Sequence, residues 1–432
     1  MLFKKKISAV HVPHCKSTQD LHSERITPPP AVTIPLKMHS GAASVPVVSE
    51  GDHVYIGTLI GKEGEGWVSA STHSSISGTV RKVTDSAITI ESDGKMEKDP
   101  SMKAPRLETE DDFLEGCRNS GIVGLGGAAY PLHGKWQAIK KNKINTVLIN
   151  GAECEPYCTA DNRTMVENAD HIKMGIGILK RFVGATRYVI GIEANKPEAI
   201  AHLTEVFKDD EQVEVMSLPS VYPQGAKQVL LWNATGLVVA AGQRLASLGV
   251  IITNVTTLAK MAEYFETGMP LCEKTISVDG TAIRNPKNII VPIGTSFEYC
   301  IDACGGFKEE PRKIIDGGPM MGDAVTDLSR PVVKACSAIV AMNGKEAFLP
   351  EPTECIHCGR CVEACPLNLN PVAFAKALDM EDEDRKYALL KKEDVAQCME
   401  CGCCAFVCPA HRPLVDNNRK DKSWMRSRKE GR

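Results

Sequence analysis

The chain of 432 residues lacks any apolar run of the roughly 18 residues that a helix needs to cross a lipid bilayer. Its first residues, MLFKKKISAV, carry charge but no long apolar stretch, so we expect no secretory signal peptide. The chain also lacks an excess of charge, because 51 Lys and Arg oppose 54 Asp and Glu. That balance gives no indication of a nucleic acid partner. These absences predict a cytoplasmic protein that is either soluble or peripheral on the cytoplasmic face of the cell membrane.

Positive charge is concentrated at the two ends of the chain, at Lys4, Lys5 and Lys6 and along the tail from 413 to 432. We expect both ends to be solvated and frayed. The alternative is that they meet an anionic membrane surface or an acidic redox partner. The length and an apolar fraction of 43% predict a globular protein of about two to four domains.

Cysteine is abundant, and eight of the 17 cysteines form two runs of identical spacing. The runs are Cys355-x2-Cys358-x2-Cys361-x3-Cys365-Pro366 and Cys398-x2-Cys401-x2-Cys404-x3-Cys408-Pro409. In bacterial ferredoxins with this run, three thiolates bind one [4Fe–4S] cluster and the fourth binds the other. We therefore assign Cys355, Cys358, Cys361 and Cys408 to cluster one. We assign Cys398, Cys401, Cys404 and Cys365 to cluster two.

Two zinc sites are the alternative interpretation of these cysteines. Structural zinc usually takes two Cys-x2-Cys pairs, and two complete four-cysteine runs that each end in proline fit that pattern badly. Cys403 lies between ligand positions, and we expect it to be a packed bystander. Because such clusters transfer single electrons, another group must collect or split electron pairs, and a flavin is the obvious candidate.

The chain divides by sequence pattern into six segments. Short alternating runs separated by glycine indicate an all-β module, and alternating strands and helices indicate a parallel α/β sheet. The segments are an extended arm (1–33), the all-β module (34–95), the parallel α/β domain (107–270), a small α+β module (274–323), the cysteine-rich domain (350–412) and the basic tail (413–432).

Two stretches of the α/β domain are candidates for a flavin site. The first, GLGGAAYP at 124–131, lacks side chains that would block a phosphate or a flavin ring, and Lys135 follows it. The second, NGAECEP at 150–156, directly follows a predicted strand at 146–150, at the edge where α/β sheets bind ligands. The alternatives are an ordinary glycine-rich turn and a polar loop that caps the sheet.

Taken together, these residues resemble the C subunit of the Rnf electron transport complex. That family is itself similar to the NADH-binding flavoprotein subunit of respiratory complex I. The resemblance covers nearly the whole chain in the order of the family. It rests on HVPHCK, EGDHVYIGTLIG, GLGGAAYP, NGAECEP, YPQG (222–225), NVTTLA (254–259), NPKNIIVPIGT, DGGPMMG and the two ferredoxin runs.

The resemblance implies a barrel-sandwich hybrid at 34–95, an FMN and NADH domain at 107–270, a β-grasp module of the SLBB type at 274–323 and a helical two-cluster ferredoxin domain. It implies a lipoyl-like module without the modified lysine, because Ser74 and Ser75 occupy the hairpin tip. It places nicotinamide near Tyr130 and Glu155. It implies that FMN is held by Gly124, Gly126, Gly127, Lys135, Asn150, Glu153, Tyr222, Gly225, Asn254 and Thr257.

The same resemblance implies an electron-transfer subunit that passes electrons between NADH, through FMN, and ferredoxin or another partner. Its partners would be membrane subunits of an Rnf-type ion-translocating complex. The chain departs from the relatives at Leu125, where complex I proteins carry Arg, and at 226–228 and 237–240, which read Ala-Lys-Gln and Leu-Val-Val-Ala. These departures favour two alternatives, a soluble Rnf-like donor to an amino-acid or cobalamin reductase and a flavin-free cluster relay.

Overall fold

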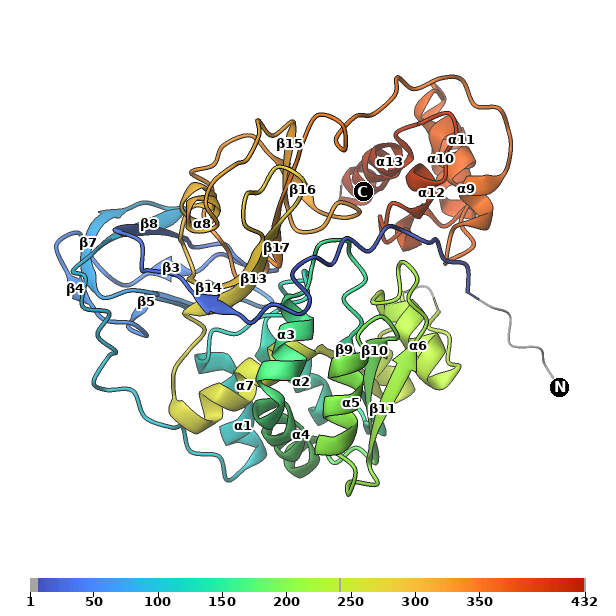
Figure 1. The fold of residues 1–432 in the computed structure, drawn as a ribbon. Helices are drawn as coiled ribbons and strands as arrows, with labels where there is room; N and C mark the ends of the chain where they lie inside the picture. The colour runs from blue at the N-terminus through green and yellow to red at the C-terminus, as the bar shows by residue number, and fades with distance from the viewer. Residues whose placement is uncertain (1–6, 241, 431–432) are drawn as a thin grey trace.

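A four-stranded parallel sheet forms the centre of the α/β domain (Figure 1). The computed structural model describes residues 7–240 and 242–430, so the lysine run at 4–6 lies outside it. The strands lie in the order β11-β10-β9-β12, and every contact between neighbours is parallel. They are β9 (Thr146–Gly151), β10 (Arg187–Glu193), β11 (Val213–Leu218) and β12 (Val250–Asn254). The prediction of a parallel α/β sheet is confirmed.

Helices cover both faces of this sheet, because its inner strands are apolar on both sides. Val147 and Ile149 pack on one face in a core that includes Leu258 of α7, while Leu148 packs on the other face with Leu230 of α6. The helices are α1 (Glu110–Asn119), α2 (Leu132–Trp136), α3 (Ala160–Glu167), α4 (Ala169–Val183), α5 (Pro197–Val206), α6 (Lys227–Thr235) and α7 (Val255–Thr267). Thr109 and Asp112 cap α1 reciprocally, as a capping box predicts.

Two small antiparallel sheets form the all-β module, in the orders β2-β8-β7-β4 and β3-β5-β6. Their strands are β2 (Ala31–Pro35), β3 (Val45–Pro46), β4 (His53–Val54), β5 (Leu59–Lys62), β6 (Thr72–His73), β7 (Gly78–Val83) and β8 (Ala87–Ser92). Inward-facing Val32, Ile34 and Ile90 have at most 1% of their surface exposed. Ser74 and Ser75, which the resemblance places at a hairpin tip, lie instead in the segment that connects β6 of one sheet to β7 of the other, and both are buried. Ser75 Oγ donates to the carbonyl of Ile293 at 2.5 Å, which fixes this segment against the next module.

A six-stranded sheet lies between the all-β module and the cysteine-rich domain (Figure 1). Its order is β1-β14-β13-β17-β15-β16, and α8 (Phe297–Ala303) packs on it. Two of its strands come from outside segment 274–323, namely β1 from the arm and β17 from the stretch before the cysteines. The strands are β1 (Glu24–Arg25), β13 (Glu273–Asp279), β14 (Lys287–Pro292), β15 (Lys313–Asp316), β16 (Asp323–Val325) and β17 (Ala338–Met342).

The basic tail forms a helix, so the prediction of a frayed end is wrong for the part of the tail that the structure describes. The helix α13 spans Leu414–Glu430 and packs against α10. Leu414, Asn418, Asp421 and Met425 repeat at helical spacing and are buried, which gives the helix one face to pack. The other helices of this domain are α9 (Arg360–Glu363), α10 (Pro371–Leu378), α11 (Glu383–Lys392) and α12 (Cys403–Phe406). None of the helices described is long and apolar enough to span a membrane.

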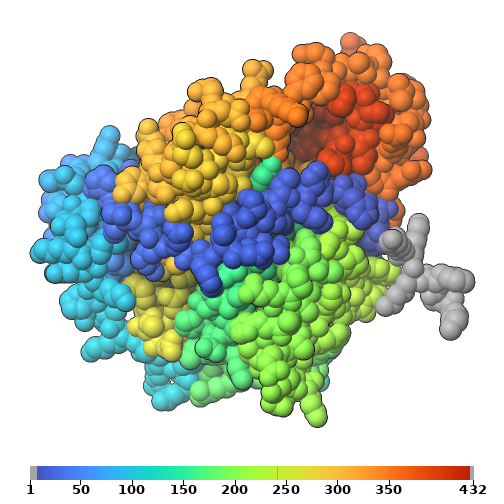
Figure 2. All heavy atoms as spheres, viewed as in Figure 1, coloured from blue at the N-terminus to red at the C-terminus, as the bar shows by residue number. Residues whose placement is uncertain are grey.

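The described part of the N-terminal arm crosses the molecule as a belt, drawn in blue in Figure 2. It runs between the α/β domain and the six-stranded sheet and touches both. Val10 exchanges backbone hydrogen bonds with Tyr222 at 2.8 and 2.9 Å, while Ser17 Oγ donates to Asp279 at 2.6 Å. The described part of the arm contains a turn at 17–20 and the short strand β1, and other segments hold it along its length.

Three parts of the chain meet at Lys334, which has 1% of its surface exposed. Its ammonium group donates to the carbonyls of Ser71 and Gly121, both at 2.7 Å. Ser71 belongs to the all-β module and Gly121 precedes the glycine-rich loop, so one side chain connects three folding units. Burial lowers the pKa of Lys334 to about 7. The neighbouring His73 is also buried, and burial together with the charge of Lys334 lowers the pKa of His73 to about 3.

His73 should make the junction sensitive to acid. Its pKa is lower in the folded chain than the ordinary 6.5, so the unfolded chain binds more protons between these values, and stability is lost as the pH falls below about 6.5. Between pH 7.5 and pH 5 this one group accounts for about 2 kcal/mol. We expect His73→Asn to lose less unfolding free energy than the wild type over that range in denaturant titrations. An equal loss in both proteins would contradict the assignment.

Candidate functional site

Two asparagines mark the point where the order of the parallel sheet reverses. Asn150 is the next-to-last residue of β9 and Asn254 is the last residue of β12, and the two are register partners. The chain leaves β9 toward β10 and β11 and returns on the other side at β12, which makes this edge the topological switch point where open α/β sheets bind ligands. Asn150 Nδ2 donates to the carbonyl of Gly225 at 3.0 Å, so the YPQG loop lies at the same edge.

The glycine-rich loop lies on the N-terminus of α7. Asn254 Oδ1 accepts from the Thr257 amide at 3.0 Å, and Thr257 Oγ1 accepts from the Leu125 amide at 2.9 Å. A Cβ at Gly126 would lie 3.1 Å from Asn254 Nδ2, whereas a Cβ at Gly127 would meet open space. Gly127 also has a φ of +93°, which favours glycine. The structure thus brings together Gly126, Gly127, Asn254 and Thr257, and residues 126–128 form the open, exposed face of the loop.

Leu125 points away from this open face. Its side chain is 2% exposed and packs in the main core, while its carbonyl accepts from Lys274 Nζ at 3.1 Å. Gly124 closes the same loop through its amide, which donates to the carbonyl of Tyr130 at 2.9 Å. The leucine that replaces the arginine of complex I proteins therefore serves the core of the α/β domain.

Lys135 and Lys227 leave positive charge uncompensated beside the loop. Burial and, to a smaller extent, the charge of Lys227 lower the pKa of Lys135 to about 8. Neither ammonium group has a hydrogen-bond or ion-pair partner among the described residues. Lys227 stands at the first position of α6, whose N-terminus has no side-chain cap and no acidic residue in its first turn. Two cations and a helix N-terminus fit an anionic phosphate such as that of FMN.

The carboxylate of Glu153 is occupied within the protein. Its two oxygens accept from the amides of Asp161 and Asn162 at 2.6 and 3.1 Å, which caps the start of α3. Burial raises the pKa of Glu153 to about 7. The carboxylate of Glu153 therefore supports the loop that follows β9.

Glu155 is bound on one side only. Its Oε2 accepts from the Met320 amide at 3.0 Å, while its buried Oε1 has no partner among the described residues. Burial raises the pKa of Glu155 to about 7. Tyr222 is buried nearby, and burial together with the charges of Glu155, Cys154 and Cys401 raises its pKa. The Tyr222 side chain, as a hydrogen-bonding neighbour, opposes the rise in the pKa of Glu155, so a buried carboxylate and a buried hydroxyl lie side by side at this edge.

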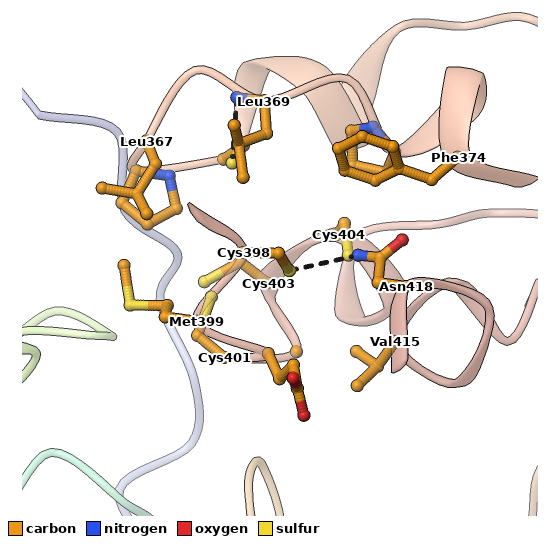
Figure 3. Close-up of a pocket in the computed structure, with 15 residues that line it drawn as sticks. Leu367, Leu369, Phe374, Cys398, Met399, Cys401, Cys403, Cys404, Val415 and Asn418 are labelled. Carbon is orange, nitrogen blue, oxygen red and sulfur yellow. Dashed lines mark hydrogen bonds between the residues drawn. The ribbon is translucent and has the colours of Figure 1, made fainter. Parts of the chain in front are cut away.

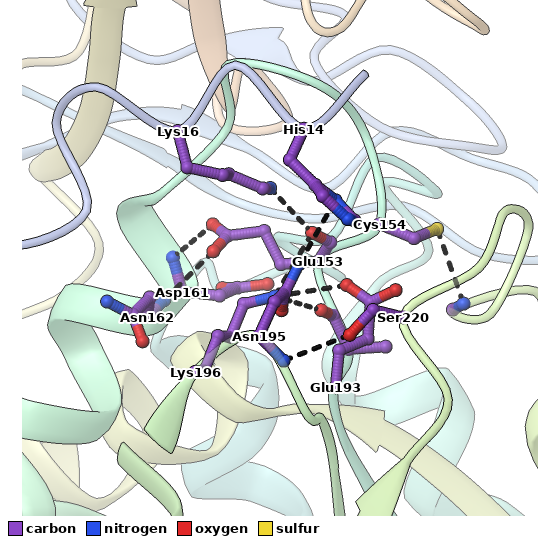
Figure 4. Close-up of polar contacts among 12 residues, drawn as sticks. His14, Lys16, Glu153, Cys154, Asp161, Asn162, Glu193, Asn195, Lys196 and Ser220 are labelled. Atoms are coloured by element: carbon purple, nitrogen blue, oxygen red, sulfur yellow. Dashed lines mark hydrogen bonds and ion pairs between the residues drawn. The ribbon is translucent and has the colours of Figure 1, made fainter. Parts of the chain in front are cut away.

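Two lysines hold the loop that carries these glutamates, and sequence patterns did not reveal either (Figure 4). Lys16, from the arm, donates to the carbonyls of Glu153, Glu155 and Cys158 at 2.8, 2.8 and 2.5 Å. Lys196 approaches from the opposite side and donates to the carbonyl of Ala152 at 2.6 Å. An ammonium group has three N–H donors, and Lys16 uses all three in hydrogen bonds to this one loop.

Five cysteines from both ferredoxin runs line one pocket (Figure 3). Four of them, Cys365, Cys398, Cys401 and Cys404, are the set assigned to cluster two, and the fifth is Cys403. The Leu369 amide lies 3.3 Å from the sulfur of Cys365, and Asn418 Nδ2 lies 3.4 Å from that of Cys398. Such donors stabilise cluster thiolates, and apolar Leu369 and Phe374 complete the wall. The donor set therefore fits a [4Fe–4S] cluster.

The second run repeats the backbone of the first. Left-handed residues stand at the same three positions of each run, and a four-residue helix follows at the same distance in both. The left-handed residues are His357, Gly359 and Asn368 in the first run and Glu400, Gly402 and His411 in the second. Among the described residues, no three His, Cys, Asp or Glu side chains close around a single metal ion. In a cubane cluster each of the four irons binds one thiolate, so the four sulfurs lie farther apart than the ligands of a single metal ion.

The two cysteine sets differ in exposure. Cys358 is exposed, and Cys355 and Cys408 are half-buried. Burial raises the pKa of Cys361, and its neighbours Cys408 and Cys355 raise it further, which indicates that these three lie together. In the second set, Cys401 and Cys404 are buried. The first set therefore includes one exposed cysteine, whereas every cysteine of the second set is buried or half-buried.

An apolar contact joins the second set to the flavin edge. Cys401 and the bystander Cys403 form one buried cluster with Tyr222 and with Val10 and Val12 of the arm. Met320 lies between the loop of Glu155 and the second cysteine run. Its amide donates to Glu155, and its carbonyl oxygen packs so closely against Gly402 that a Cβ there would lie only 2.9 Å away. The YPQG loop, the DGGPMMG turn and the second cysteine run therefore meet at one place.

Four family models match successive parts of the chain. They are the RnfC barrel sandwich hybrid domain at residues 5–97, the Nuo51 FMN-binding domain at 117–263, the SLBB domain at 275–324 and the 4Fe-4S dicluster domain at 351–425. Their order reproduces the architecture implied by the sequence. The dicluster model extends into α13, in agreement with the folded tail.

Curated relatives match most of the chain, and all three named here are C subunits. That of the Na(+)-translocating ferredoxin:NAD(+) oxidoreductase complex of Acetobacterium woodii is 40% identical, over 85% of this chain and 86% of that protein. That of the proton-translocating ferredoxin:NAD(+) oxidoreductase complex of Clostridium ljungdahlii is 41% identical, over 79% and 77%. That of the ion-translocating oxidoreductase complex of Rhodobacter capsulatus is 36% identical, over 83% and 72%.

A solved structure shares the fold. The air-oxidized NAD+-reducing [NiFe]-hydrogenase contains a chain that matches with a TM-score of 0.52 at 16% identity. The match covers 72% of this chain and 60% of that chain. At this identity the likeness concerns the fold alone.

Lys16 can be tested without any ligand. Lys16→Met keeps the length of the side chain and removes its three donors, so the loop around two left-handed residues, Glu153 and Tyr157, should open more often. We expect faster amide hydrogen exchange at 153–159 in Lys16→Met, near wild-type exchange in Lys16→Arg, and no change in the control Lys37→Met, which alters an exposed lysine. Unchanged exchange in Lys16→Met would contradict the role of Lys16.

The crossed assignment of cysteines can be tested by pairing variants. We expect the wild type to hold about eight irons per chain and each single Cys→Ser ligand variant about four. Cys365→Ser should leave the same residual electron paramagnetic resonance signal as Cys398→Ser and a different one from Cys358→Ser. Cys403→Ser is the matched control and should keep all the iron. Identical residual signals in Cys365→Ser and Cys358→Ser would contradict crossed ligation.

Proposed function

The chain belongs to the family of C subunits of Rnf-type ion-translocating oxidoreductase complexes, and we propose that it exchanges electrons between a nicotinamide nucleotide and a protein partner. It is an iron–sulfur flavoprotein subunit with FMN and two [4Fe–4S] clusters. FMN supplies the exchange between a hydride and single electrons, and the clusters supply one-electron transfer. The protein contributes binding, spacing and protection from water.

The buried cluster that contains both Tyr222 and Cys401 carries this proposal. It joins the flavin edge to the cysteines of cluster two, so cluster two is the inner cluster and cluster one the outer. The exposure of Cys358 and of Ile356, which is 67% exposed, suits the passage of electrons between cluster one and a partner. Electrons entering at the nucleotide would thus meet the buried set first and the exposed set last.

The flavin would lie along the carboxyl edge of β9 and β12. Lys135 and Lys227 would bind its phosphate, and the glycine-rich loop would cover one face of its ring. Lys16 and Lys196 would hold the loop of Glu155, whose free oxygen faces the nucleotide. The remaining contacts would come from Gly124, Gly126, Gly127, Asn150, Tyr222, Gly225, Asn254 and Thr257, with Glu153 as support.

The partners of the chain follow from its relatives. The relative from Acetobacterium woodii is named as part of a Na(+)-translocating ferredoxin:NAD(+) oxidoreductase complex. We place this chain in the same way, as a peripheral subunit on the cytoplasmic face of the membrane with NADH as one substrate. Other subunits would move the ion, and ferredoxin-like proteins would exchange electrons with the complex.

A soluble donor to a dedicated reductase is the second candidate. It is favoured by the segment from Leu237 to Ala240, which replaces the charged stretch of the relatives and leaves Val238 71% exposed. Co-purification distinguishes the two candidate functions. A subunit of a membrane complex sediments with the membrane subunits, whereas a soluble donor co-purifies with its reductase.

The proposed function is tested by anaerobic purification and reconstitution, followed by iron, sulfide and flavin analysis and an NADH titration. We expect about eight irons and one FMN per chain, with absorbance bleached by NADH. Full iron and flavin without bleaching by NADH would overturn the nucleotide assignment. Full iron without flavin would leave a cluster relay that takes electrons from a protein donor.

The phosphate site can be tested with two flavins. Lys135→Met removes a positive charge beside the phosphate, so it should weaken FMN binding about tenfold, the effect of losing one ionic hydrogen bond. Riboflavin has no phosphate, and its affinity should change little. Lys141→Met, an exposed lysine nearby, is the control. The measurement is flavin fluorescence on the flavin-depleted protein, and equal losses for FMN and riboflavin would show that Lys135 acts elsewhere.

A further inference from the structure

Trp67 is the one tryptophan of the described residues that lies mostly in solvent. It is 72% exposed, while Trp136 is fully buried and Trp232 and Trp424 are half-buried. An exposed indole keeps a large apolar surface in water, and such residues are common where ligands bind. Trp67 belongs to the all-β module, in the loop 63–68 between β5 and β6.

The loop holds Trp67 in place. Ala42 donates to the carbonyl of Val68, and Gly64 donates to Ser69 Oγ, both at 3.0 Å. A Cβ at Gly64 would lie 2.0 Å from the carbonyl oxygen of Ala43, so the two segments pack backbone to backbone. Because the loop is fixed by these contacts, the exposed position of the indole is built into the fold.

The loop is also tied to the α/β domain. Glu63 receives a hydrogen bond from Arg118 at 2.9 Å, which connects the start of the loop to α1. The Ser40 amide donates to the carbonyl of Ala129 at 3.0 Å, which connects the neighbouring segment to the glycine-rich loop. The all-β module therefore presents Trp67 to the flavin domain at a set position.

The ring of Trp67 lies beside the ring of Tyr130. Their centroids are 5.6 Å apart, and their planes are inclined by 39°. At this inclination the two rings do not stack on each other, so a face of the indole stays available. Tyr130 is half-buried at the end of the glycine-rich loop, where the nucleotide is expected.

We propose that Trp67 and Tyr130 together hold a flat heteroaromatic ring of the nicotinamide dinucleotide, so that the all-β module completes the nucleotide site. This inference rests on the proposed function. Nicotinamide and adenine share the chemistry that two aromatic side chains recognise, a planar π system that stacks. Ser74 and Ser75 stand where the resemblance would place a modified lysine, and both are buried, so the exposed indole of Trp67 gives the module this different task.

The test is NAD+ binding to the full chain with its clusters and FMN, measured by titration calorimetry and by tryptophan emission. Trp67→Ala should weaken NAD+ binding about tenfold, the usual effect of removing one stacking partner of a base. Trp67→Phe keeps a ring and should keep most of the affinity, but it should lose the change in emission. Trp424→Phe, at the far end of the ferredoxin domain, is the matched control and should keep both.

ADP-ribose and nicotinamide mononucleotide identify the ring. Whichever compound loses affinity in Trp67→Ala contains the ring that Trp67 contacts, and a loss for either one supports the proposal. Iron and flavin contents equal to those of the wild type show that the variants are folded. Equal NAD+ affinity and equal emission changes in the wild type and Trp67→Ala would overturn the proposal. If the wild type binds no NAD+, the nucleotide function itself fails and this inference fails with it.

Discussion

Lysine ammonium groups that donate hydrogen bonds to backbone carbonyls fix the domains of this molecule relative to one another. Lys334 joins the all-β module to the α/β domain, Lys274 binds the carbonyl of Leu125 under the glycine-rich loop, and Lys16 fastens the arm to the loop of Glu155. A desolvated charged donor makes a strong hydrogen bond, and losing it leaves several carbonyls unpaired at once. Each of these lysines meets a loop at the flavin edge or just before it, so the shape of the site depends on contacts between domains.

The position of the cysteine-rich domain follows from the same junction. The arm, the YPQG loop and the DGGPMMG turn meet where Cys401 and Cys403 are buried. The second cysteine set therefore lies against the α/β domain, and the first set includes the exposed Cys358. In the proposed function this arrangement makes the second set the inner redox centre and the first set the outer one.

Local patterns in the sequence were enough to predict the main elements and to propose the cysteine sets. Hydrophobic periodicity predicted the parallel sheet, and identical spacing predicted the cysteine sets, because both depend on residues close in the chain. Contacts over long separations could not be predicted in this way. Lys16 lies more than 130 residues from the carbonyls that it binds, and β17 joins a sheet whose other strands lie elsewhere in the chain. The tail appeared frayed because its charge concealed the spacing of Leu414, Asn418 and Asp421. Trp67 carries no motif, and only its place beside Tyr130 distinguishes it.

The central claim is that the cluster of Cys365, Cys398, Cys401 and Cys404 is the inner one. It is tested most directly by freeze-quench electron paramagnetic resonance after mixing with NADH, on variants that keep one cluster each. Cys358→Ser keeps only the inner cluster. The signal of that reduced cluster should appear as fast as the first signal of a reduced cluster appears in the wild type. Cys398→Ser keeps only the outer cluster and should be reduced much more slowly. Fast reduction in Cys398→Ser and slow reduction in Cys358→Ser would contradict the account.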